Sequence, residues 1–368
     1  MKIAQISQHY LPVIGGQEVY IDNLNRVFRD SGWETVVYQL DRGVRRADVV
    51  TIPRSRILAK LIRGSEPYML NFLLRLLKGR ELERADVVVA HYAFHAFAFR
   101  HFKKKPVVLS HGIEWHLENQ TSDDREHERR AKACLEEFPH VVNDTHYLRH
   151  FGYDLKPGTG CFTEVAPRKW FIPNCVDVEH FKRSDGIPAV RARKTILVPR
   201  QIVVDRGILL AIEAFKALAE EDKDLTLHII GKIRPGAYID GCRELVRKLE
   251  LTDRVIIQDH VTNAEMVNYY SSATMTVIPT LRREGTSLSA LESMACGTAT
   301  VSTNAAGLAD LPTVQCDPNP QALAEAMRST LRNLDAVAAE QNRAVRETFN
   351  FTNWASAWRS VINSIATH

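Results

Sequence analysis

The chain has 368 residues, of which 45% are hydrophobic and 25% are charged, and its formal net charge at pH 7 is +4. This length suits two domains of ordinary size, and the composition is that of a globular protein, which argues against a disordered chain. The small positive charge does not by itself indicate nucleic-acid binding, and we expect no partner of that class.

Cysteine usage and hydropathy indicate the cellular setting. The six cysteines are scattered without a Cys-x-x-Cys pair, so we predict neither a zinc ribbon nor a disulfide framework, and a reducing, cytoplasmic setting fits best. The N-terminus turns polar at Ser7, and no uncharged apolar stretch reaches the roughly 18 residues that a spanning helix needs. We therefore expect no signal peptide, and a protein that is soluble or bound to a membrane surface.

The first half of the chain predicts alternating strands and helices. An apolar strand at 2–7 is followed by a loop with Gly15-Gly16, a helix at 17–30, and a further strand. This is the first βαβ unit of a doubly wound parallel sheet. The stretch 15–18 is not the Gly-x-Gly-x-x-Gly fingerprint, so a nicotinamide cofactor is not indicated. Additional buried strands are predicted at 86–90, 106–110 and 141–144.

The segment 54–80 is rich in both leucine and basic residues, and helical spacing would gather Leu58, Leu61 and Ile62 on one face. Two interpretations are equally favoured. The segment is either an amphipathic helix on an anionic membrane surface, or a helix packed on its own domain with a solvated basic face.

His111 follows the strand at 106–110, on the sheet edge that also carries Gly16. An imidazole at this place can hydrogen-bond a reacting hydroxyl or orient an acceptor. The other histidines of this half, namely His91, His95, His101 and His127, are predicted to be structural or exposed. Asp123 and Asp124 are discounted as metal ligands, because adjacent carboxylates on a helix point apart.

After a linker at 182–194, strands are predicted at 195–199, 225–230, 254–258, 274–279 and 299–302, with helices between them. Arg200 and Arg206 lie around the first strand-to-helix loop. Two cations in such a loop suit a diphosphate, whose charge they neutralise. Surface salt bridging is the alternative.

The stretch 278–297 contains a strand end, a polar loop with Glu284, and a helix from Ser287 to Gly297 that carries Glu292. Helix N-termini at strand carboxyl ends bind anions in parallel sheets. The site suits a ligand that offers a phosphate to the backbone amides and hydroxyls to the two carboxylates. A nucleotide sugar has both kinds of group. Alternatively, Ser289 and Glu292 form only a capping box.

The Glu-x7-Glu spacing of Glu284 and Glu292, followed by Ala-Cys-Gly, resembles the donor site of retaining glycosyltransferases of family 4. The stretch 15–18 is similar to the Gly-Gly-x-Glu loop of that family. The stretch 172–177 resembles its Ile-Pro-Asn-Gly-Val-Asp segment, with Cys175 in place of glycine. The family carries Gly-Arg and Lys-Gly around the first loop of the second domain, where this chain has Pro199-Arg200 and Arg206-Gly207.

This resemblance implies a GT-B fold, α/β, with two Rossmann-like doubly wound domains that face a central cleft and a C-terminal helix that crosses back to the first domain. The implied ranges are 1–178 for the acceptor-side domain, 179–350 for the donor domain and 351–368 for the terminal helix.

The resemblance also implies residue roles. Glu284 and His111 would hold donor-sugar hydroxyls and the emerging positive charge, with the leaving phosphate as base in a front-face substitution. No essential divalent metal or other cofactor is expected. The remaining predicted site residues are, for donor binding, Gly16, Arg200, Arg206, Gly285, Thr286, Ser287, Leu288 and Glu292, and for the acceptor, Gln17, Trp115 and His116.

The expected function is transfer of a sugar from a UDP- or GDP-linked donor to a glycan or lipid-linked acceptor in polysaccharide biosynthesis, with contact to an anionic membrane through 54–80. The expected location is the cytoplasm or the inner face of the cell membrane. Two alternatives stay open: a catalytically silent nucleotide-sugar-binding partner of another transferase, and another GT-B enzyme such as a nucleotide-sugar epimerase.

Overall fold

The computed structural model describes residues 1–368 except 14, 56, 58–65, 159, 161, 185–193 and 368. It contains two compact units. Unit 1 comprises 1–155, 162–172 and 354–368, and unit 2 comprises 156–161 and 173–353. The domain ranges given above from the sequence stay predictions.

Unit 1 is built on an eight-stranded sheet of order β3-β2-β1-β4-β5-β6-β8-β7. All neighbouring strands are parallel except β7 and β8, which pair antiparallel. The strands are β1 (Lys2–Ile6), β2 (Glu34–Leu40), β3 (Val49–Ile52), β4 (Val87–His91), β5 (Val107–Ser110), β6 (His140–Val142), β7 (Thr163–Ala166) and β8 (Lys169–Phe171). The helices are α1 (Gly16–Asp30), α3 (Glu66–Glu83), α4 (Ala93–Ala98), α5 (Ser122–Glu137), α6 (Thr145–His150) and α13 (Phe351–Ala366).

Unit 2 is built on a six-stranded parallel sheet of order β11-β10-β9-β12-β13-β14. The strands are β9 (Lys194–Pro199), β10 (Leu225–Ile230), β11 (Val255–Gln258), β12 (Met275–Ile278), β13 (Thr300–Thr303) and β14 (Val314–Cys316). The helices are η2 (Val204–Arg206), α7 (Ile208–Glu221), α8 (Ala237–Lys248), α9 (Asn263–Ser272), α10 (Leu288–Ala295), η3 (Ala306–Asp310), α11 (Pro320–Arg332) and α12 (Leu334–Thr348).

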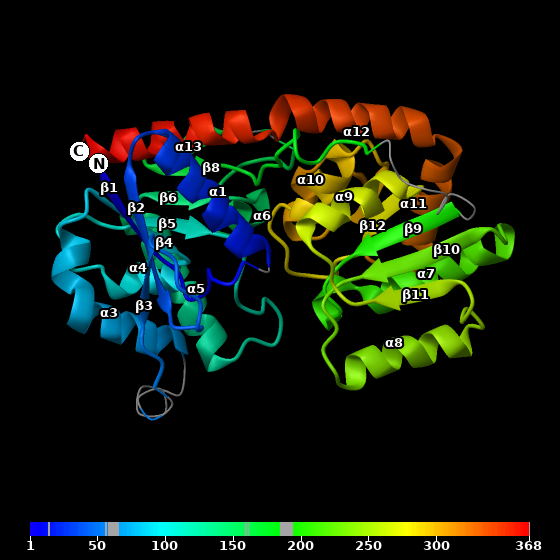
Figure 1. Ribbon diagram of the computed structural model, residues 1–368, viewed down its shortest axis with the longest axis horizontal. Helices are drawn as coiled ribbons and strands as arrows, with labels where there is room; N and C mark the ends of the chain where they lie inside the picture. The colour runs from blue at the N-terminus through cyan, green and yellow to red at the C-terminus, as the bar shows by residue number, and fades with distance from the viewer. Residues whose placement is uncertain are drawn as a thin grey trace. The chain divides into compact units, whose positions relative to one another are not determined.

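Alternating side chains of β9 build two separate cores, because successive residues of a strand point to opposite faces of the sheet. Ile196 and Val198 pack with residues of α7, α8 and α11. Leu197 packs with residues of α9, α10 and α12 on the other face. In unit 1, Tyr38 of β2 packs with α3, whereas Val37 packs with α1. Both sheets are therefore doubly wound, which confirms the predicted α/β class (Figure 1).

The terminal helix α13 belongs to unit 1 from Trp354 onward, as predicted, and lies beside α1 (Figure 1). The indole N–H of Trp358 donates to the hydroxyl of Tyr20 at 2.9 Å, and the ring of Trp354 meets Tyr20 edge-on at 5.0 Å. The apolar stripe of α13 thus completes the core of unit 1 next to the first βαβ turn.

Strands β3, β7, β8 and β14 were not predicted from the sequence. Each has three or four residues and lies at or near a sheet edge. Runs this short show no clear periodic pattern, and pairing with a neighbouring strand decides whether they form strands.

Helix α3 covers the described part of the leucine-rich basic segment. Its residues Met69, Leu70 and Leu74 are buried against the sheet of unit 1, so own-domain packing is present in α3. Phe72, Leu76 and Leu77 are exposed on the same helix. Leu58, Leu61 and Ile62 lie outside the described residues, and membrane contact stays a prediction. Among the helices that the structure describes, none combines the length and hydropathy required to cross a bilayer.

Candidate functional site

The site in unit 2 lies where the strand order reverses. Strands β9 and β12 are neighbours at the centre of the sheet, and the chain winds outward from them in both directions. In open α/β sheets, ligands bind at the carboxyl ends of the strands at such a switch point. Arg200 directly follows β9, and Glu284 lies in the loop that follows β12. The predicted pair is therefore brought together at the edge that most often binds ligands.

Two glycines allow the loops at this edge to touch. A Cβ on Gly231 would lie 1.9 Å from the carbonyl oxygen of Arg200, and one on Gly207 would lie 1.8 Å from that of Pro279. Both distances are far below van der Waals contact, and Gly207 also has a φ of +68°, which favours glycine. The backbone at Arg200 thus depends on Gly231, and the start of the loop that carries Glu284 depends on Gly207.

The side chain of Arg200 is 7% exposed and surrounded by acceptors. Its Nη2 donates to Thr280 Oγ1 at 3.0 Å and to the carboxylate of Glu284, while its Nη1 lies 3.4 Å from Ser287 Oγ. Burial lowers the pKa of Arg200 to about 10. The guanidinium therefore stays protonated at neutral pH, and Glu284 neutralises its charge.

Arg206 completes a three-membered charge cluster. Its Nη1 also donates to the carboxylate of Glu284 and, at 2.8 Å, to the carbonyl oxygen of Arg283. The same two loops are tied by a second ion pair, from Arg283 Nη2 to Asp205 at 2.7 Å. One carboxylate thus faces two guanidiniums, and the cluster has a net positive charge.

The start of α10 is held by the stretch that resembled the Ile-Pro-Asn segment. The backbone N–H of Asn174 donates to Thr286 Oγ1 at 2.7 Å, and its side-chain amide donates to the carbonyl oxygen of Thr286. Ser287 is the N-cap of α10, with no hydrogen bond from its side chain to the first turn. Gly285 and Leu288, on either side of these residues, are partly exposed. The predicted donor-binding residues 285–288 therefore form the entry to one helix N-terminus.

Glu292 lies one turn further along α10 and is partly exposed. Its Oε2 accepts a hydrogen bond of 2.8 Å from the hydroxyl of Tyr270. Burial disfavours the charged form and raises the pKa of Glu292 to about 7. The alternative interpretation of Glu292 as part of a capping box with Ser289 is wrong, because the helix N-cap is Ser287.

In unit 1, β1 and β4 are neighbours at the corresponding reversal of strand order. Gly16 begins α1, and Glu18 closes the preceding turn by accepting from the N–H of Gly15 at 2.8 Å. The amide of Gln17 is held at both ends: its oxygen accepts from the Tyr92 hydroxyl at 3.1 Å, and its nitrogen donates to Ser7 Oγ at 3.0 Å.

His111 is partly exposed and follows β5. Its Nε2 lies 3.1 Å from Nδ1 of His91, and the two rings are nearly parallel. Burial lowers the pKa of His111 to about 3, so the imidazole is neutral at physiological pH. A neutral ring is suited to hydrogen-bond a hydroxyl and carries no charge with which to attract an anion.

The structure corrects the prediction for Trp115. Its side chain is 1% exposed and packs with Tyr147 and Phe151 in the core of unit 1, so it offers no face to an acceptor. The sequence placed this aromatic residue after a strand end but did not show that α6 covers it. The neighbouring His116 is exposed.

Several residues of these sites were not predicted. Thr280 and Asn174 contact predicted residues, and both stand in stretches that were singled out, so their position was a usable signal. Tyr270 and His91 are contributed by other elements. No local pattern connects Tyr270 with Glu292 or His91 with His111.

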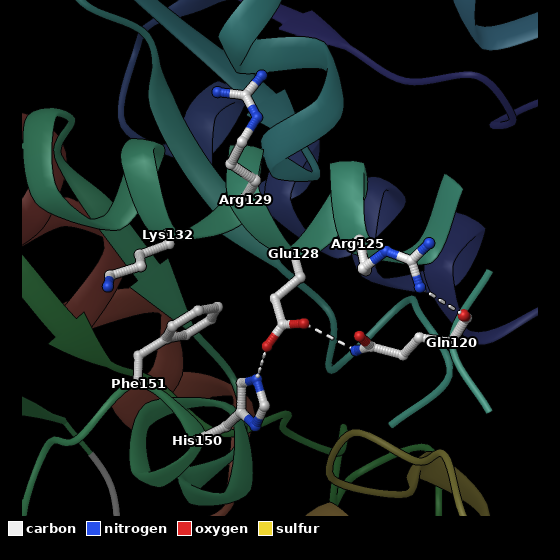
Figure 2. A pocket seen from close by; sticks show the side chains of 7 residues that line it. All are labelled: Gln120, Arg125, Glu128, Arg129, Lys132, His150 and Phe151. Carbon is white, nitrogen blue, oxygen red and sulfur yellow. Dashed lines mark hydrogen bonds and ion pairs between the residues drawn. The ribbon is translucent and has the colours of Figure 1, made fainter. Parts of the chain in front are cut away.

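A surface pocket of about 500 Å³ lies on α5, and none of the predicted site residues lines it (Figure 2). Its central carboxylate, Glu128, accepts from His150 at 2.6 Å and from the amide of Gln120 at 2.7 Å. This carboxylate is already paired, and we assign the pocket no role. The other lining residues are Arg125, Arg129, Lys132 and Phe151.

The chain matches two family models, one in each unit. Residues 14–151 match the model described as Glycosyltransferase Family 4, and residues 193–333 match the model described as Glycosyl transferases group 1. Both units are glycosyltransferase domains.

A curated relative of this chain is the D-inositol 3-phosphate glycosyltransferase of Nocardiopsis dassonvillei, which is 29% identical over 206 residues. The match covers 51% of this chain and 43% of that relative, so it spans less than half of the relative's length.

Solved structures match the chain over nearly its full length. Sucrose-phosphate synthase from Thermosynechococcus elongatus superimposes with a TM-score of 0.78 at 18% identity, covering 100% of this chain and 99% of that one. The Anabaena protein HepE, solved in complex with UDP and glucose, superimposes with a TM-score of 0.76 at 15% identity, covering 99% and 100%. At these identities the likeness shows the fold, and the predicted GT-B fold is confirmed.

Proposed function

We propose that this glycosyltransferase moves a sugar from a nucleoside-diphosphate sugar, UDP- or GDP-linked, to a glycan or lipid-linked acceptor with retention of configuration. The observation that carries the proposal is the cluster of Arg200, Glu284 and Arg206 at the switch point of unit 2. The Anabaena protein of the same fold was solved with UDP and glucose, which supports a nucleotide-sugar donor.

In this proposal, Arg200 and Arg206 bind the diphosphate and stabilise it as it leaves, together with first-turn amides of α10. Guanidinium groups form charge-assisted hydrogen bonds with phosphate oxygens. Both guanidiniums already donate to the carboxylate of Glu284, so a diphosphate oxygen competes with Glu284 for the same N–H groups. Binding of the diphosphate would then release the carboxylate toward sugar hydroxyls. The guanidiniums supply the positive charge, and no divalent metal is included in the proposed reaction.

Glu292 is proposed to bind the nucleotide ribose. One of its oxygens accepts from Tyr270, which fixes the carboxylate and leaves its other lone pairs for hydroxyl groups. Because the pKa is about 7, the fraction of ionised Glu292 changes within the physiological pH range. Nucleotide affinity should follow that fraction.

His111 is proposed to hydrogen-bond a donor-sugar hydroxyl, and Gln17 and His116 are proposed to contact the acceptor. The reaction is proposed to be a front-face substitution in which the leaving phosphate takes the proton of the acceptor hydroxyl. This part of the proposal rests on the family resemblance and on the exposure of His111 and His116.

For membrane contact, α3 supplies exposed Phe72, Leu76 and Leu77 beside the exposed cation Arg75. An apolar patch with adjacent cations suits an anionic lipid surface. Cosedimentation with anionic vesicles at low salt tests this proposal. A double variant with Phe72→Ser and Leu76→Ser should lose vesicle binding. Absence of wild-type binding would overturn the membrane part and leave the donor site untouched.

The deciding experiment is calorimetric titration with UDP, GDP and ADP on the wild type, on Arg200→Ala and on Arg282→Ala. Arg282 lies on the same loop as Glu284 but is exposed, so it is a matched control for loss of one positive charge. We expect one diphosphate to bind the wild type and Arg282→Ala but not Arg200→Ala. If no diphosphate binds to any of the three proteins, the proposed donor site is refuted. Binding of a diphosphate without sugar transfer would favour the catalytically silent partner.

A further inference from the structure

His91 is a completely buried polar side chain that no part of the proposed reaction uses. It ends β4, the strand that pairs with β1 at the reversal of strand order in unit 1. Both ring nitrogens have partners: Nδ1 lies 3.1 Å from Nε2 of His111, and Nε2 lies 3.1 Å from Oε1 of Gln5. Which nitrogen of His91 carries the proton depends on the side chains to which Gln5 is hydrogen-bonded.

The direction of these hydrogen bonds is set at the far end by a carboxylate. The hydroxyl of Tyr10 lies 2.6 Å from Oδ1 of Asp22, which carries an ion pair of 3.1 Å with Arg46. An ionised carboxylate can only accept, so Tyr10 uses its single proton on Asp22. The amide of Asn25, 2.9 Å from the same hydroxyl, must therefore donate to Tyr10 through Nδ2.

The orientation of Asn25 then determines that of Gln5. With Nδ2 of Asn25 on Tyr10, its Oδ1 faces Gln5, and Gln5 donates to it through Nε2 at 2.6 Å. The hydroxyl of Thr35 donates to the same oxygen at 2.8 Å and accepts from Nε2 of Gln5 at 3.1 Å, which agrees with the orientation of Asn25 that Tyr10 and Asp22 set. The oxygen of Gln5 is consequently the atom that faces His91.

Because Gln5 presents an oxygen, His91 must donate to it through Nε2. In a neutral imidazole the other nitrogen is then an acceptor, so Nδ1 of His91 accepts from Nε2–H of His111. Every donor in the series His111, His91, Gln5, Asn25 and Tyr10 points the same way, toward Asp22. Aligned hydrogen bonds polarise one another, so the series is stabilised as a unit.

We infer that His91 is a positioning residue that fixes His111 as the Nε2–H tautomer and leaves Nδ1 of His111 as a hydrogen-bond acceptor for a ligand. Within the described ranges of the chain, Nδ1 of His111 has no hydrogen-bond partner. Tyr20 and Tyr92 meet the His111 ring edge-on at 5.0 and 5.1 Å and hold its plane.

The assignment states which ligand atoms His111 recognises. A bare Nδ1 accepts from a hydroxyl or an N–H group and repels a phosphate oxygen, because both atoms are lone-pair acceptors. His111 therefore selects a hydroxyl of the sugar rather than the diphosphate. This last step rests on the proposed function, whereas the tautomer itself does not.

Nitrogen-15 NMR of the histidine-labelled protein tests the tautomer directly, with the His111 signals identified by their loss in His111→Gln. We expect a proton on Nε2 and none on Nδ1 in the wild type. His91→Phe keeps a ring for packing but removes both nitrogens, and its His111 should become a mixture of tautomers. His91→Asn offers an oxygen close to the place of Nδ1 and should restore the single tautomer.

Turnover provides the second measurement. His91→Phe should lower kcat/KM for the donor by about tenfold, as for loss of one well-aligned hydrogen bond, and leave the affinity for UDP unchanged. His91→Asn should recover most of the loss. If neither the wild type nor any variant transfers a sugar, the proposed function fails, while the NMR result still decides the tautomer of His111.

A proton on Nδ1 of His111 in the wild type would overturn the inference. So would a His91→Phe variant with an unchanged tautomer and unchanged turnover. If His91→Phe does not fold, Tyr10→Phe removes the anchoring hydroxyl at the other end of the series. That variant should also give mixed tautomers, and a single unchanged tautomer there would refute the directional series.

Discussion

The two units present the same strand order at their switch points but opposite chemistry. In unit 2 the carboxyl edge holds two guanidiniums on one largely buried carboxylate. In unit 1 the corresponding edge holds the neutral His111, oriented by a series of hydrogen bonds. The fold supplies the same kind of edge twice, and the side chains decide whether it suits an anion or a hydroxyl. Substitutions that exchange or remove those side chains test this comparison.

The largest effect is expected for Arg200→Ala, which removes the buried charge from the anion-binding edge. Loss of one preorganised charged donor should lower kcat by about 10²–10³-fold and abolish detectable diphosphate binding. Steady-state kinetics and calorimetry measure both. Arg200→Ala with turnover and UDP affinity close to those of Arg282→Ala would show that unit 2 does not bind the diphosphate there.

Gly231→Ala tests whether the backbone positions Arg200. The added Cβ would lie 1.9 Å from the carbonyl oxygen of Arg200, so the loop must shift, at a cost of about 1–3 kcal/mol in unfolding free energy. We also expect weaker diphosphate binding.

Gly241→Ala is the control for this change. Gly241 lies within α8, where an added Cβ meets nothing within 4 Å. Alanine there should stabilise the helix by up to about 1 kcal/mol. Thermal melts that place both variants above the wild type would contradict the close approach at Gly231.

Glu284→Gln separates charge neutralisation from catalysis. The amide removes the anion that competes for Arg200 and Arg206, so affinity for UDP should rise by a few-fold, about 1 kcal/mol. Turnover should fall, because the carboxylate no longer stabilises positive charge on the sugar. Calorimetry and initial rates report the two effects separately. A fall in UDP affinity would mean that Glu284 orders the arginines for the diphosphate and does not compete with it.

A further effect is expected from the pH dependence of Glu292. Its folded-state pKa of about 7 lies above the ordinary value of 4.5, so its stability contribution is present below about 4.5 and lost as pH rises through about 7. Glu292→Gln should therefore melt close to the wild type at pH 4 and above it at pH 8, by about 2 kcal/mol.

The ionisation of Glu292 also predicts how nucleotide-sugar binding depends on pH. Affinity for UDP-glucose, whose phosphates do not titrate in this range, should rise from pH 6 to 8 in the wild type and stay level in Glu292→Gln. Parallel profiles in the two proteins would exclude Glu292 from the nucleotide site.

The sequence was sufficient for the ends of the strands β5, β9 and β12, which precede the predicted site residues, and for the residues that immediately follow them. Arg200, Glu284 and His111 were predicted because an apolar run ends just before each of their loops, and loops after parallel strands share one edge. Trp115 shows the limit of that reasoning, since a residue after a strand end can also turn inward. Its burial depends on α6, which begins thirty residues further along the chain.

What the sequence by itself determined is the alternation of strands and helices, and with it the edge at which each polar loop lies. These follow from local periodicity and from turn residues, which act over a few positions. Only the tertiary structure decided the partners: Tyr270 on Glu292, Asn174 on Thr286, and His91 on His111. Such contacts join elements that are distant in the chain, and no local pattern specifies the distance and direction on which a hydrogen bond depends.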